Sequence, residues 1–438
     1  MASLFDFVKT FCLAQGFDKT YWIGYSGGLD SHVLLHLFVE LRKQYPLQLK
    51  AVHVHHGLST HADAWAIHCA KVCGDLQIEF VQKTIDAKAL AGDSPENKAR
   101  QRRYEVFTGL LAAQDVLLTA HQQDDQAETV LVQLLRGAGP KGLAAMPVLK
   151  PFAAGLHGRP LLSASRRELK QYAEKNQLSW IDDESNENEN FTRNFLRHTV
   201  LPVLKQRWPT VTTTLARVAE NCAETQQIVA TMAAQDLAMC RKEKDQTLAI
   251  KKLGLLDKVR QRQVLRAWLT ELGFSLPSAV KLQQIQRVFL QASHDKSPYI
   301  NWGEVEIRRH RDALYAMPFL PLHDATQVFS WDMSQELVIP QLGTLCATLS
   351  EGAGLRLDIQ QVTVRFRQGG ERCYFPERGH HQSLKHLLQQ WNIPPWQRDR
   401  LPLLYVNDTL IAVTGFFINA SYLAVPGKQW QLVIDSCK

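Results

Sequence analysis

The sequence predicts an α/β protein whose N-terminal part is built on a parallel sheet. Strand-like apolar runs alternate with segments of helical periodicity in the first half, the stretch 211–293 is mostly helical in pattern, and β-rich runs return near the C-terminus. At about 100–200 residues per domain, 438 residues suggest two to four domains. We predict three parts: a sheet-based domain over 1–212, a mostly helical domain over 213–318, and a linker with a small α+β domain over 319–438.

The first part shows strands and helices in strict alternation. Strand-like runs at 21–25, 49–56, 78–82 and 116–120 are separated by helix-like segments at 29–41, 63–73 and 124–136. A further helix start is predicted at Ser94-Pro95-Glu96, where a capping hydroxyl precedes a proline and an acid. This order is typical of a parallel sheet with helices on both faces, in which ligands bind beyond the carboxyl ends of the strands.

The later elements follow from different signals. The polar and acidic run 182–190 predicts a loop. A helix is predicted over 259–273, where an apolar stripe includes Val264, Trp268 and Leu272. Two β-rich runs within 404–418 flank Asn407-Asp408, which is a turn signal, so we expect a hairpin there.

Composition narrows the class of protein. The chain is 45% hydrophobic and 21% charged, with a net charge of +7, which is compatible with a polyanionic partner. We expect no membrane span, and the N-terminus lacks the pattern of a signal peptide, so a cytoplasmic protein is expected. The eight cysteines are scattered, and the one close pair, Cys69 and Cys73, fits neither a zinc knuckle nor a redox motif. We interpret them as buried free thiols.

The turn after the first strand carries the strongest chemical signal. It reads SGGLDS, from Ser26 to Ser31, with Gly27, Gly28, Leu29 and Asp30 between. A strand that turns into a helix exposes unpaired N–H groups, and glycines let a ligand approach closely, so this loop suits a phosphate. Asp30 would repel a phosphate unless a cation lay between them, which implies Mg²⁺. The alternative interpretation is a plain helix cap after a tight turn.

The loop resembles the signature of the PP-loop ATP pyrophosphatases. Further runs narrow the family: VHVHHGLS (52–59), ENKARQRRY (96–104), TAHQQDDQAETVLVQLLRGAGPKGLAAM (119–146), RPLL (159–162), WIDDESN (180–186), RNFLR (193–197) and SLKHLLQQWNIPPWQRDRLPLLY (383–405). Together they resemble the tRNA(Ile)-lysidine synthetase family over nearly the whole chain. The resemblance implies that 1–212 is a PP-loop ATP-binding catalytic domain and that the other two parts bind tRNA.

A second motif combines an imidazole with carboxylates. His121, Asp125 and Glu128 are spaced for one face of a predicted helix, and Asp124 is placed to cap it. Such a set suits Mg²⁺ binding or proton transfer. Acids in a first helical turn also simply complement the helix dipole, and the resemblance favours the active site over that interpretation.

Four arginines are candidates for anion binding. Arg100 and Arg103 precede Tyr104, and Arg193 and Arg197 lie one helical turn apart. A guanidinium suits pyrophosphate or a tRNA phosphate. The alternative is pairing with the nearby acidic run at 182–189.

The run HVHH (53–56) invites a zinc hypothesis, but no cysteine is placed to join His53 and His55. His55 also stands where the family more often has Asp. We interpret His56-Gly57 as shaping the nucleotide pocket.

The C-terminal part interleaves arginines with aromatic residues, which suits RNA phosphates and stacked bases. We expect Lys385 and Arg398 to contact tRNA, although Gln382, Ser383 and His386 replace the basic residues common in relatives. The alternative is a small β-rich core with a solvated basic face, and Trp391 and Trp396 are expected in that core. The cluster Arg308, Arg309 and Arg311 has no role assigned by the sequence.

The resemblance implies a ligase that joins free L-lysine to C2 of the first anticodon cytidine of tRNA(Ile) with a CAU anticodon. ATP would first adenylate the cytidine with release of diphosphate, and lysine would then displace AMP. The product, lysidine, would change the codon read from AUG to AUA. By the same resemblance Asp30, Arg103, His121, Asp125 and Glu128 are catalytic, residues 26–31 bind ATP, Mg²⁺ accompanies ATP at Asp30, and a homodimer is possible.

Two alternatives remain at this stage. A tRNA-thiolating enzyme of the same superfamily would need cysteines as sulfur carriers or cluster ligands, and none stands in a suitable motif. An inactive tRNA-binding module would not need the intact motifs at 26–31 and 121–128.

Overall fold

The structure is a computed structural model, and it divides into two compact units, Met1–Ala230 and Thr231–Lys438. It describes residues 3–55, 61–85, 95–182, 188–242, 246–291, 298–351, 354–375, 380–424 and 428–435. Ser94, His56-Gly57 and 183–187, which the sequence analysis singled out, lie outside these residues. The division into three parts at 212 and 318 stays a prediction. In the described parts of the chain, no helix is both long and apolar enough to cross a membrane.

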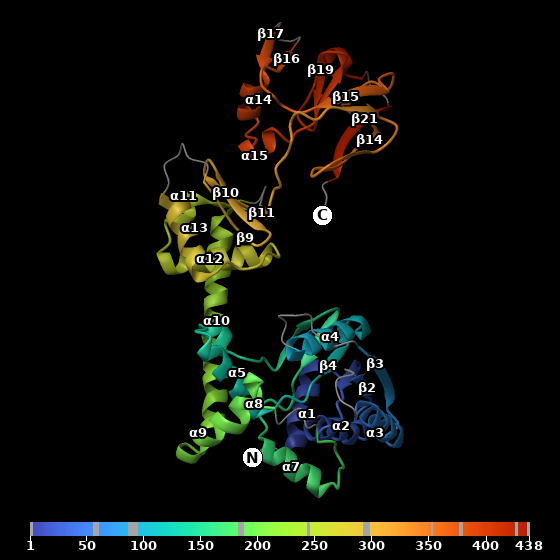
Figure 1. Cartoon of the computed structure of the whole chain (residues 1–438), viewed down its shortest axis with the longest axis vertical. Coiled ribbons are helices and arrows are strands. Elements are labelled where there is room, and N and C mark those ends of the chain that lie inside the picture. Colours follow the sequence, from blue (N-terminus) through green and yellow to red (C-terminus); the bar gives the residue numbers. More distant parts are fainter. Residues whose placement is uncertain are drawn as a thin grey trace. The chain divides into compact units, whose positions relative to one another are not determined.

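Unit 1 is built on a six-stranded sheet (Figure 1). The strands lie in the order β3 (Glu79–Thr84), β2 (Gln48–His55), β1 (Thr20–Gly24), β4 (Val116–Leu118), β6 (Gly155–Gly158) and β5 (Leu149–Phe152). The first five are parallel, as predicted, and β5 pairs antiparallel with β6 at the edge. The chain moves from β1 to β2 and β3 on one side and returns to β4 on the other. The strand order therefore reverses between β1 and β4, where sheets of this kind bind ligands.

The helices of unit 1 follow the strands in the predicted alternation. They are α1 (Leu4–Gln15), α2 (Leu29–Arg42), α3 (Ala62–Asp75), α4 (Pro95–Leu110), α5 (Gln123–Leu135), α6 (Pro140–Leu143), α7 (Arg166–Lys175), α8 (Thr192–Phe195) and α9 (Leu201–Arg207). The π-helical turn Leu196–Val200 joins α8 to α9, and α10 (Val211–Cys240) crosses the boundary between the units.

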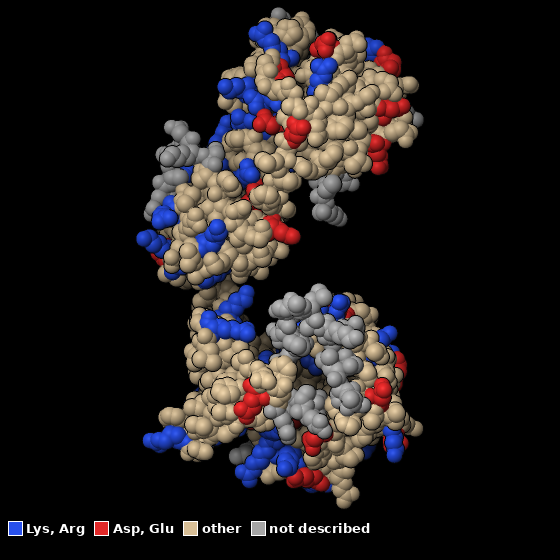
Figure 2. Space-filling view, in the orientation of Figure 1, with Lys and Arg blue, Asp and Glu red and all other residues tan. Residues whose placement is uncertain are grey.

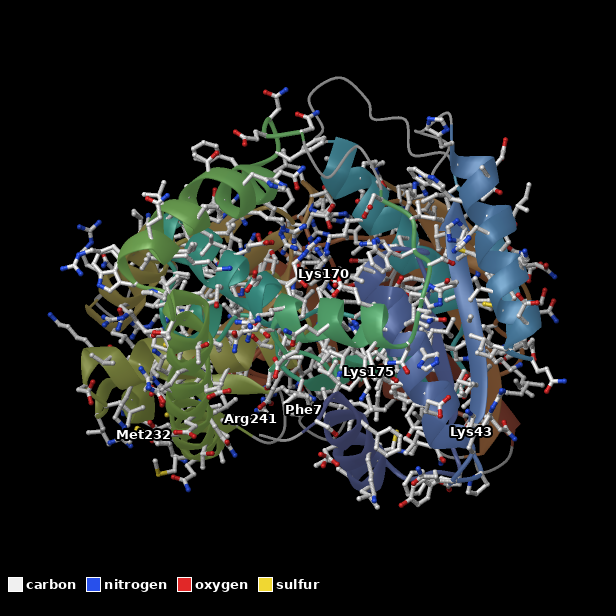
Figure 3. The ribbon with its side chains drawn as sticks, turned by 90° about the horizontal axis from the view of Figure 1, so that it is seen from below. Phe7, Lys43, Lys170, Lys175, Met232 and Arg241 are labelled. Carbon is white, nitrogen blue, oxygen red and sulfur yellow. The ribbon has the colours of Figure 1, made fainter. Side chains whose placement is uncertain are left out.

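Helices cover both faces of the sheet because side chains alternate along each strand. In β1, Tyr21 and Ile23 enter a core shared with α1, α2, α3 and α7, whereas Trp22 enters a second core with Phe107 and Leu111 at the end of α4. Figure 3 shows α7 with Lys170 and Lys175, and the helix is tied to α2 by a hydrogen bond between the His36 ring and the Tyr172 hydroxyl, 2.9 Å apart.

The first part of unit 2 is helical, as predicted, and it also holds a sheet that the sequence analysis did not place. The helices are α11 (Ile250–Gly254), α12 (Lys258–Glu271) and α13 (Ala279–Gln291). The five-stranded sheet has the order β7 (Arg241–Lys242), β8 (Thr247–Ala249), β11 (Ala313–Pro318), β10 (Val305–His310) and β9 (Tyr299–Trp302). Trp268 of α12 is fully buried in the core between these layers, which explains its place on the predicted stripe.

The C-terminal part is α+β, as predicted. Its largest sheet has the order β12 (Phe329–Asp332), β15 (Gln361–Arg365), β18 (Leu403–Val406), β19 (Thr409–Val413) and β20 (Phe417–Ile418). Smaller sheets are formed by β13 (Leu337–Ile339), β14 (Gly343–Glu351) and β21 (Lys428–Asp435), and by β16 (Arg372–Phe375) and β17 (His380–Ser383), with α14 (Leu384–Gln390) and α15 (Pro395–Arg398) beside them. The expected hairpin is confirmed: Val406 pairs with Thr409, and Asn407 takes a positive φ of 53° in the turn.

Candidate active site

The loop from Ser26 to Ser31 connects β1 to α2, as the sequence predicts. Gly27 has a φ of +83°, and a Cβ there would lie 2.8 Å from Ile181 Cδ1 and 3.0 Å from Cys69 Sγ. The Ile181 N–H donates to Gly27 O at 3.0 Å, so the segment at 181 lies directly against the loop. Only glycine combines this conformation with this close approach.

Hydroxyl groups fix the inside of the loop. Ser26 Oγ and Ser31 Oγ lie 3.1 Å apart, and Ser31 Oγ donates to Gly28 O at 3.0 Å. Gly28 is the N-cap residue of α2, and it provides no side-chain cap. The first turn of α2, which begins at Leu29, therefore keeps donor groups that can face a phosphate.

Asp30 lies in the first turn of α2, and its Oδ1 atom is buried with no hydrogen-bond partner among the described residues. Burial raises the pKa of Asp30 to about 6; Asp125 adds to the rise, while Arg166 and Arg197 oppose it. A buried, unpartnered carboxylate oxygen beside a phosphate-binding loop fits Mg²⁺, which is held in nucleotide sites by one or two carboxylates and by the phosphates themselves. Among the described residues no group of three or more His, Cys, Asp or Glu side chains forms a metal cage.

Arg197 brings the carboxylates of α5 together. Its Nε donates to Glu128 Oε1 at 2.6 Å, and its Nη2 donates to Glu128 Oε2 at 3.1 Å and to Asp125 Oδ1 at 2.9 Å. Glu128 is fully buried, whereas the Asp125 side chain is 14% exposed. Arg197 comes from the π-helical turn at 196–200, a distortion that is frequent at functional sites. These partners lie on α5; most of the acidic run 182–189, the alternative partner considered for this arginine, lies outside the described residues.

Opposing influences set the ionisation of this pair. Burial raises the pKa of Glu128 to about 7, although the Arg197 charge and hydrogen bonds lower it. Burial alone would lower the pKa of Arg197. The negative charges of Glu128, Asp125 and Asp30 outweigh burial, so the pKa of Arg197 is raised overall. Asp30, Asp125, Glu128 and Arg197 therefore form one coupled group at the carboxyl ends of β1 and β4.

Two expectations about the start of α5 are wrong. The helix begins at Gln123, so His121 lies in the preceding loop and not on the helix face. The cap is Gln122, whose side chain accepts from the Asp124 N–H at 2.7 Å, and Asp125 Oδ2 accepts from the Gln122 N–H at 2.9 Å. Asp124 instead accepts from Lys205 of α9 at 3.0 Å. The reciprocal cap satisfies two backbone N–H groups at the start of the helix, so the helix begins directly after Gln122.

His121 is placed by a buried polar network. Its Nδ1 lies 2.7 Å from Thr119 Oγ1, and the same oxygen lies 2.8 Å from His157 Nε2. Burial lowers the pKa of His121 well below its ordinary value, and Arg159, Arg100, His157 and Arg103 lower it further. The structure thus brings His121 close to the two arginines of α4. The Arg100 guanidinium also lies over the Tyr104 ring, 5.2 Å from its centroid.

The remaining predicted residues are placed as follows. Arg193 of α8 is half-buried and is among the groups that lower the pKa of Glu128, so it lies near the coupled group. Lys385 of α14 is exposed, as a phosphate contact requires. Arg398 is half-buried and its Nε donates to Ile393 O at 2.9 Å, so part of its role is structural.

The arginine cluster that the sequence left unassigned is engaged within unit 2. Arg308 donates to the buried Glu306 at 2.7 and 3.1 Å, Arg309 donates to Phe289 O at 3.0 Å, and Arg311 donates to Gln389 O at 2.9 Å. Trp396, expected in the core, is only half-buried and lies 5.5 Å from the Arg308 guanidinium. Trp391 is likewise half-buried and packs at the edge of its core.

The two histidines considered for zinc are engaged elsewhere. His53 Nδ1 lies 3.0 Å from Tyr25 O, and His55 Nε2 lies 3.1 Å from Asp63 Oδ1. These contacts favour structural roles for both side chains.

Sequence reasoning missed Thr119, His157, Arg159 and Lys205. Thr119 and Arg159 stand within the motifs quoted above, but nothing in their spacing links them to a histidine 38 residues from Thr119.

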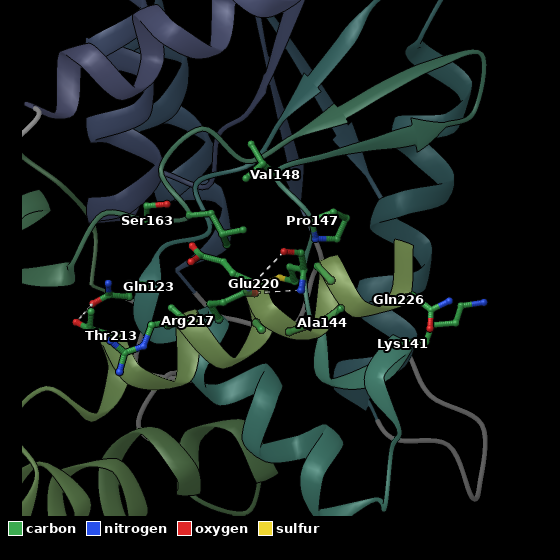
Figure 4. Close-up of a pocket in the computed structure, with 17 residues that line it drawn as sticks. Gln123, Lys141, Ala144, Pro147, Val148, Ser163, Thr213, Arg217, Glu220 and Gln226 are labelled. Atoms are coloured by element: carbon green, nitrogen blue, oxygen red, sulfur yellow. Dashed lines mark hydrogen bonds between the residues drawn. The ribbon is translucent and has the colours of Figure 1, made fainter. Parts of the chain in front are cut away.

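A pocket of about 560 Å³ lies between α5, the segment 144–148 and α10 (Figure 4). Gln126 fixes its floor, because its side chain donates to Met146 O at 2.9 Å and accepts from Met146 N at 3.0 Å. Lys141, Arg217 and Glu220 are the charged residues that line it. None of the predicted site residues lines this pocket.

Comparisons with known proteins agree along the chain. A family model described as a PP-loop domain matches residues 8–204. Models described as the TilS substrate binding domain and the TilS substrate C-terminal domain match residues 248–315 and 362–434.

Three curated relatives are named tRNA(Ile)-lysidine synthase. That of Coxiella burnetii is 45% identical over 416 residues, which cover 94% of this chain and 92% of the relative. That of Serratia proteamaculans is 41% identical over 426 residues, covering 95% and 96%. That of Methylococcus capsulatus is 38% identical over 420 residues, also covering 95% and 96%.

Proposed function

The chain belongs to the tRNA(Ile)-lysidine synthase family, and from that premise we propose that it ligates free L-lysine to C2 of the first anticodon cytidine of tRNA(Ile). ATP is converted to AMP and diphosphate in the reaction. The product, lysidine, pairs with A and not with G, so the tRNA would read AUA in place of AUG. The observation that supports this best is the coupled group of Asp30, Asp125, Glu128 and Arg197 beside the loop 26–31.

The first step activates the base. Residues 26–31 hold the ATP phosphates with the N–H groups at the start of α2 and the two serine hydroxyls. Asp30 would hold Mg²⁺, which would offset the negative charge of the ATP phosphates. Arg100, Arg103 and Arg193 supply the charge that receives the departing diphosphate. The cytidine O2 forms a bond to the α-phosphorus while the bond to diphosphate breaks. The adenylate turns a poor oxygen leaving group into a good one.

The second step needs a neutral amine. The lysine ε-ammonium must lose a proton before its nitrogen attacks C2 and AMP leaves. Of the two carboxylates that Arg197 binds, Asp125 is the better placed because its side chain is partly exposed, whereas Glu128 is fully buried and accepts from Arg197 with both oxygens. We therefore assign proton transfer to Asp125 and the positioning of Arg197 to Glu128.

The cysteines give no support to a thiolating enzyme. Within the described residues seven cysteines are free, and five of these are buried. Burial raises the pKa of Cys12, Cys69, Cys73 and Cys373 to about 12, so these thiols are poor nucleophiles. We also propose a cytoplasmic location and keep the homodimer as a proposal.

The deciding experiment measures incorporation of labelled lysine into tRNA(Ile) transcripts with C or U at the first anticodon position, in the presence of ATP and Mg²⁺. Incorporation only with C is expected. Diphosphate release that needs tRNA but not lysine would separate adenylation from ligation. No ATP cleavage with any tRNA would overturn the proposal in favour of an inactive binding module.

A further inference from the structure

The polar network behind His121 crosses two neighbouring strands. Thr119 follows β4, His157 lies in β6, and Arg159 follows β6; the Thr119 N–H donates to Gly158 O at 3.1 Å, which continues the pairing of the strands. His157 and Arg159 are both buried, at 0% and 3% exposure. Arg159 Nη2 lies 3.2 Å from His157 Nδ1, and Arg159 Nη1 donates to Pro147 O at 2.7 Å.

The direction of each hydrogen bond in this network follows from the chemistry of its members. A guanidinium can only donate, so His157 Nδ1 must accept from Arg159. A neutral imidazole that accepts at Nδ1 carries its proton on Nε2, so His157 Nε2 donates to Thr119 Oγ1. The Thr119 hydroxyl still has its own proton to donate, and His121 Nδ1, 2.7 Å away, is the ring nitrogen placed to accept it. A neutral His121 that accepts there carries its proton on Nε2.

The geometry therefore points to a relay, Arg159–His157–Thr119, that fixes His121 as the Nε2–H tautomer, so that His121 serves as a hydrogen-bond donor to an anionic oxygen of the substrate and not as a general base. This inference rests on the proposed function, because the anionic oxygen is that of the ATP phosphates or of the departing diphosphate. Thr119, His157 and Arg159 are positioning residues that act through His121.

The charges around His121 support a donor role. Burial lowers the pKa of His121 most strongly, and the charges of Arg159, Arg100 and Arg103 lower it further. Burial and Arg159 likewise lower the pKa of His157, to about 3. Both rings are thus neutral near pH 7, as the relay requires. A neutral imidazole beside two guanidinium groups of α4 completes a set of donors for phosphate oxygens.

The direct test is the side-chain ¹⁵N spectrum of histidine-labelled full-length protein, in which the His121 signals are identified by their loss in His121→Gln. We expect a protonated Nε2 and an unprotonated Nδ1 in the wild type. Thr119→Val should remove the fixed tautomer, Thr119→Ser should restore it, and Thr108→Val, an exposed site on α4, should leave it unchanged.

Single-turnover diphosphate release gives the second readout. Glutamine can donate through its amide but cannot act as a base, so His121→Gln should be at least about tenfold faster than His121→Ala. Thr119→Val should slow the step by about tenfold, as expected for loss of one hydrogen bond, and Thr119→Ser should recover most of it. The pH profiles of wild type and His121→Gln should have the same shape.

The relay is overturned if His121 carries its proton on Nδ1, or if His121→Gln is as slow as His121→Ala and loses an acid limb from its pH profile. The spectrum can be read without any activity. Failure of the wild type to incorporate lysine would therefore refute the proposed function, and the spectrum would still decide on the relay.

Discussion

The Asp125 carboxylate holds two structural contacts before any substrate arrives. One oxygen accepts from the Gln122 N–H in the cap of α5, and the other accepts from Arg197. An asparagine retains an oxygen for the cap but cannot take a proton from an amine. Function and structure can therefore be separated at this residue by one substitution.

We predict that Asp125→Asn lowers turnover at least about a hundredfold and changes tRNA affinity less than about threefold. Single-turnover lysine incorporation and filter binding measure the two effects. The matched control is Asp124→Asn, one position along the helix, where the carboxylate pairs with Lys205. Near wild-type turnover in Asp125→Asn would remove Asp125 from the chemistry.

The pKa of Glu128 predicts how stability depends on pH. Because it is raised to about 7 in the folded chain, the folded state holds more protons than the unfolded state between about pH 5 and pH 7. The contribution of Glu128 to stability is therefore present at low pH and is lost as the pH rises through about 7. A glutamine at position 128 does not titrate, so its contribution to stability does not change with pH.

We expect the melting temperature of the wild type, relative to that of Glu128→Gln, to fall between about pH 5.5 and pH 8. Scanning calorimetry of the full chain at both pH values gives this difference. A relative gain by the wild type at higher pH would mean that the Arg197 pair outweighs the burial of Glu128.

At the scale of elements, the loop between β1 and α2 owes its shape to a contact that no local pattern contains. Gly27 needs its positive φ, but it also lies under Ile181, which follows the last helix before the acidic run. A side chain at 27 would both strain the backbone and displace the segment at 181. The phosphate loop and the segment at 181 are thus one structural feature.

We predict that Gly27→Ala raises the KM for ATP at least about tenfold, since an L-residue at positive φ costs roughly 1–2 kcal/mol and the contact with Ile181 is lost. tRNA binding should be unchanged. Gly109→Ala is the control, because a Cβ at that position of α4 meets nothing within 4 Å. An unchanged KM in Gly27→Ala would show that the loop adapts.

At the scale of the whole molecule, two groups of basic residues in unit 2 differ in their surroundings. Arg308, Arg309 and Arg311 donate to groups of their own unit, so they stabilise the fold. Lys385 and Arg372 are exposed on the face of unit 2 that carries α14 and β16, where Figure 2 shows Lys and Arg side chains gathered. We expect the exposed second group to contact tRNA phosphates.

We predict that Lys385→Ala weakens tRNA binding several-fold at low salt and reduces the slope of log K against log[salt] by about 1. Rates with saturating tRNA should not change. The control is Lys43→Ala at the C-cap of α2, labelled in Figure 3, where the ammonium group already pairs with Glu40 at 2.6 Å. An unaltered salt slope in Lys385→Ala would exclude this contact.

The sequence by itself determined the parallel sheet, the phosphate loop, the C-terminal hairpin and the family, because periodicity, turn residues and contiguous motifs are local properties of a chain. The sequence motifs at 26–31 and 121–128 follow β1 and β4, the two strands between which the strand order of the sheet reverses. The sequence pattern placed His121 on the helix face and Asp124 in the cap, whereas Gln122 forms the cap and His121 lies in the loop before it.

Only the tertiary structure decided which charges meet. Arg197 pairs with Asp125 and Glu128, about seventy residues away along the chain. The proton of His121 is assigned through His157 and Arg159, from a strand 38 residues beyond Thr119. Hydrogen-bond direction and burial depend on neighbours brought together by folding, and a pattern along one chain does not contain them.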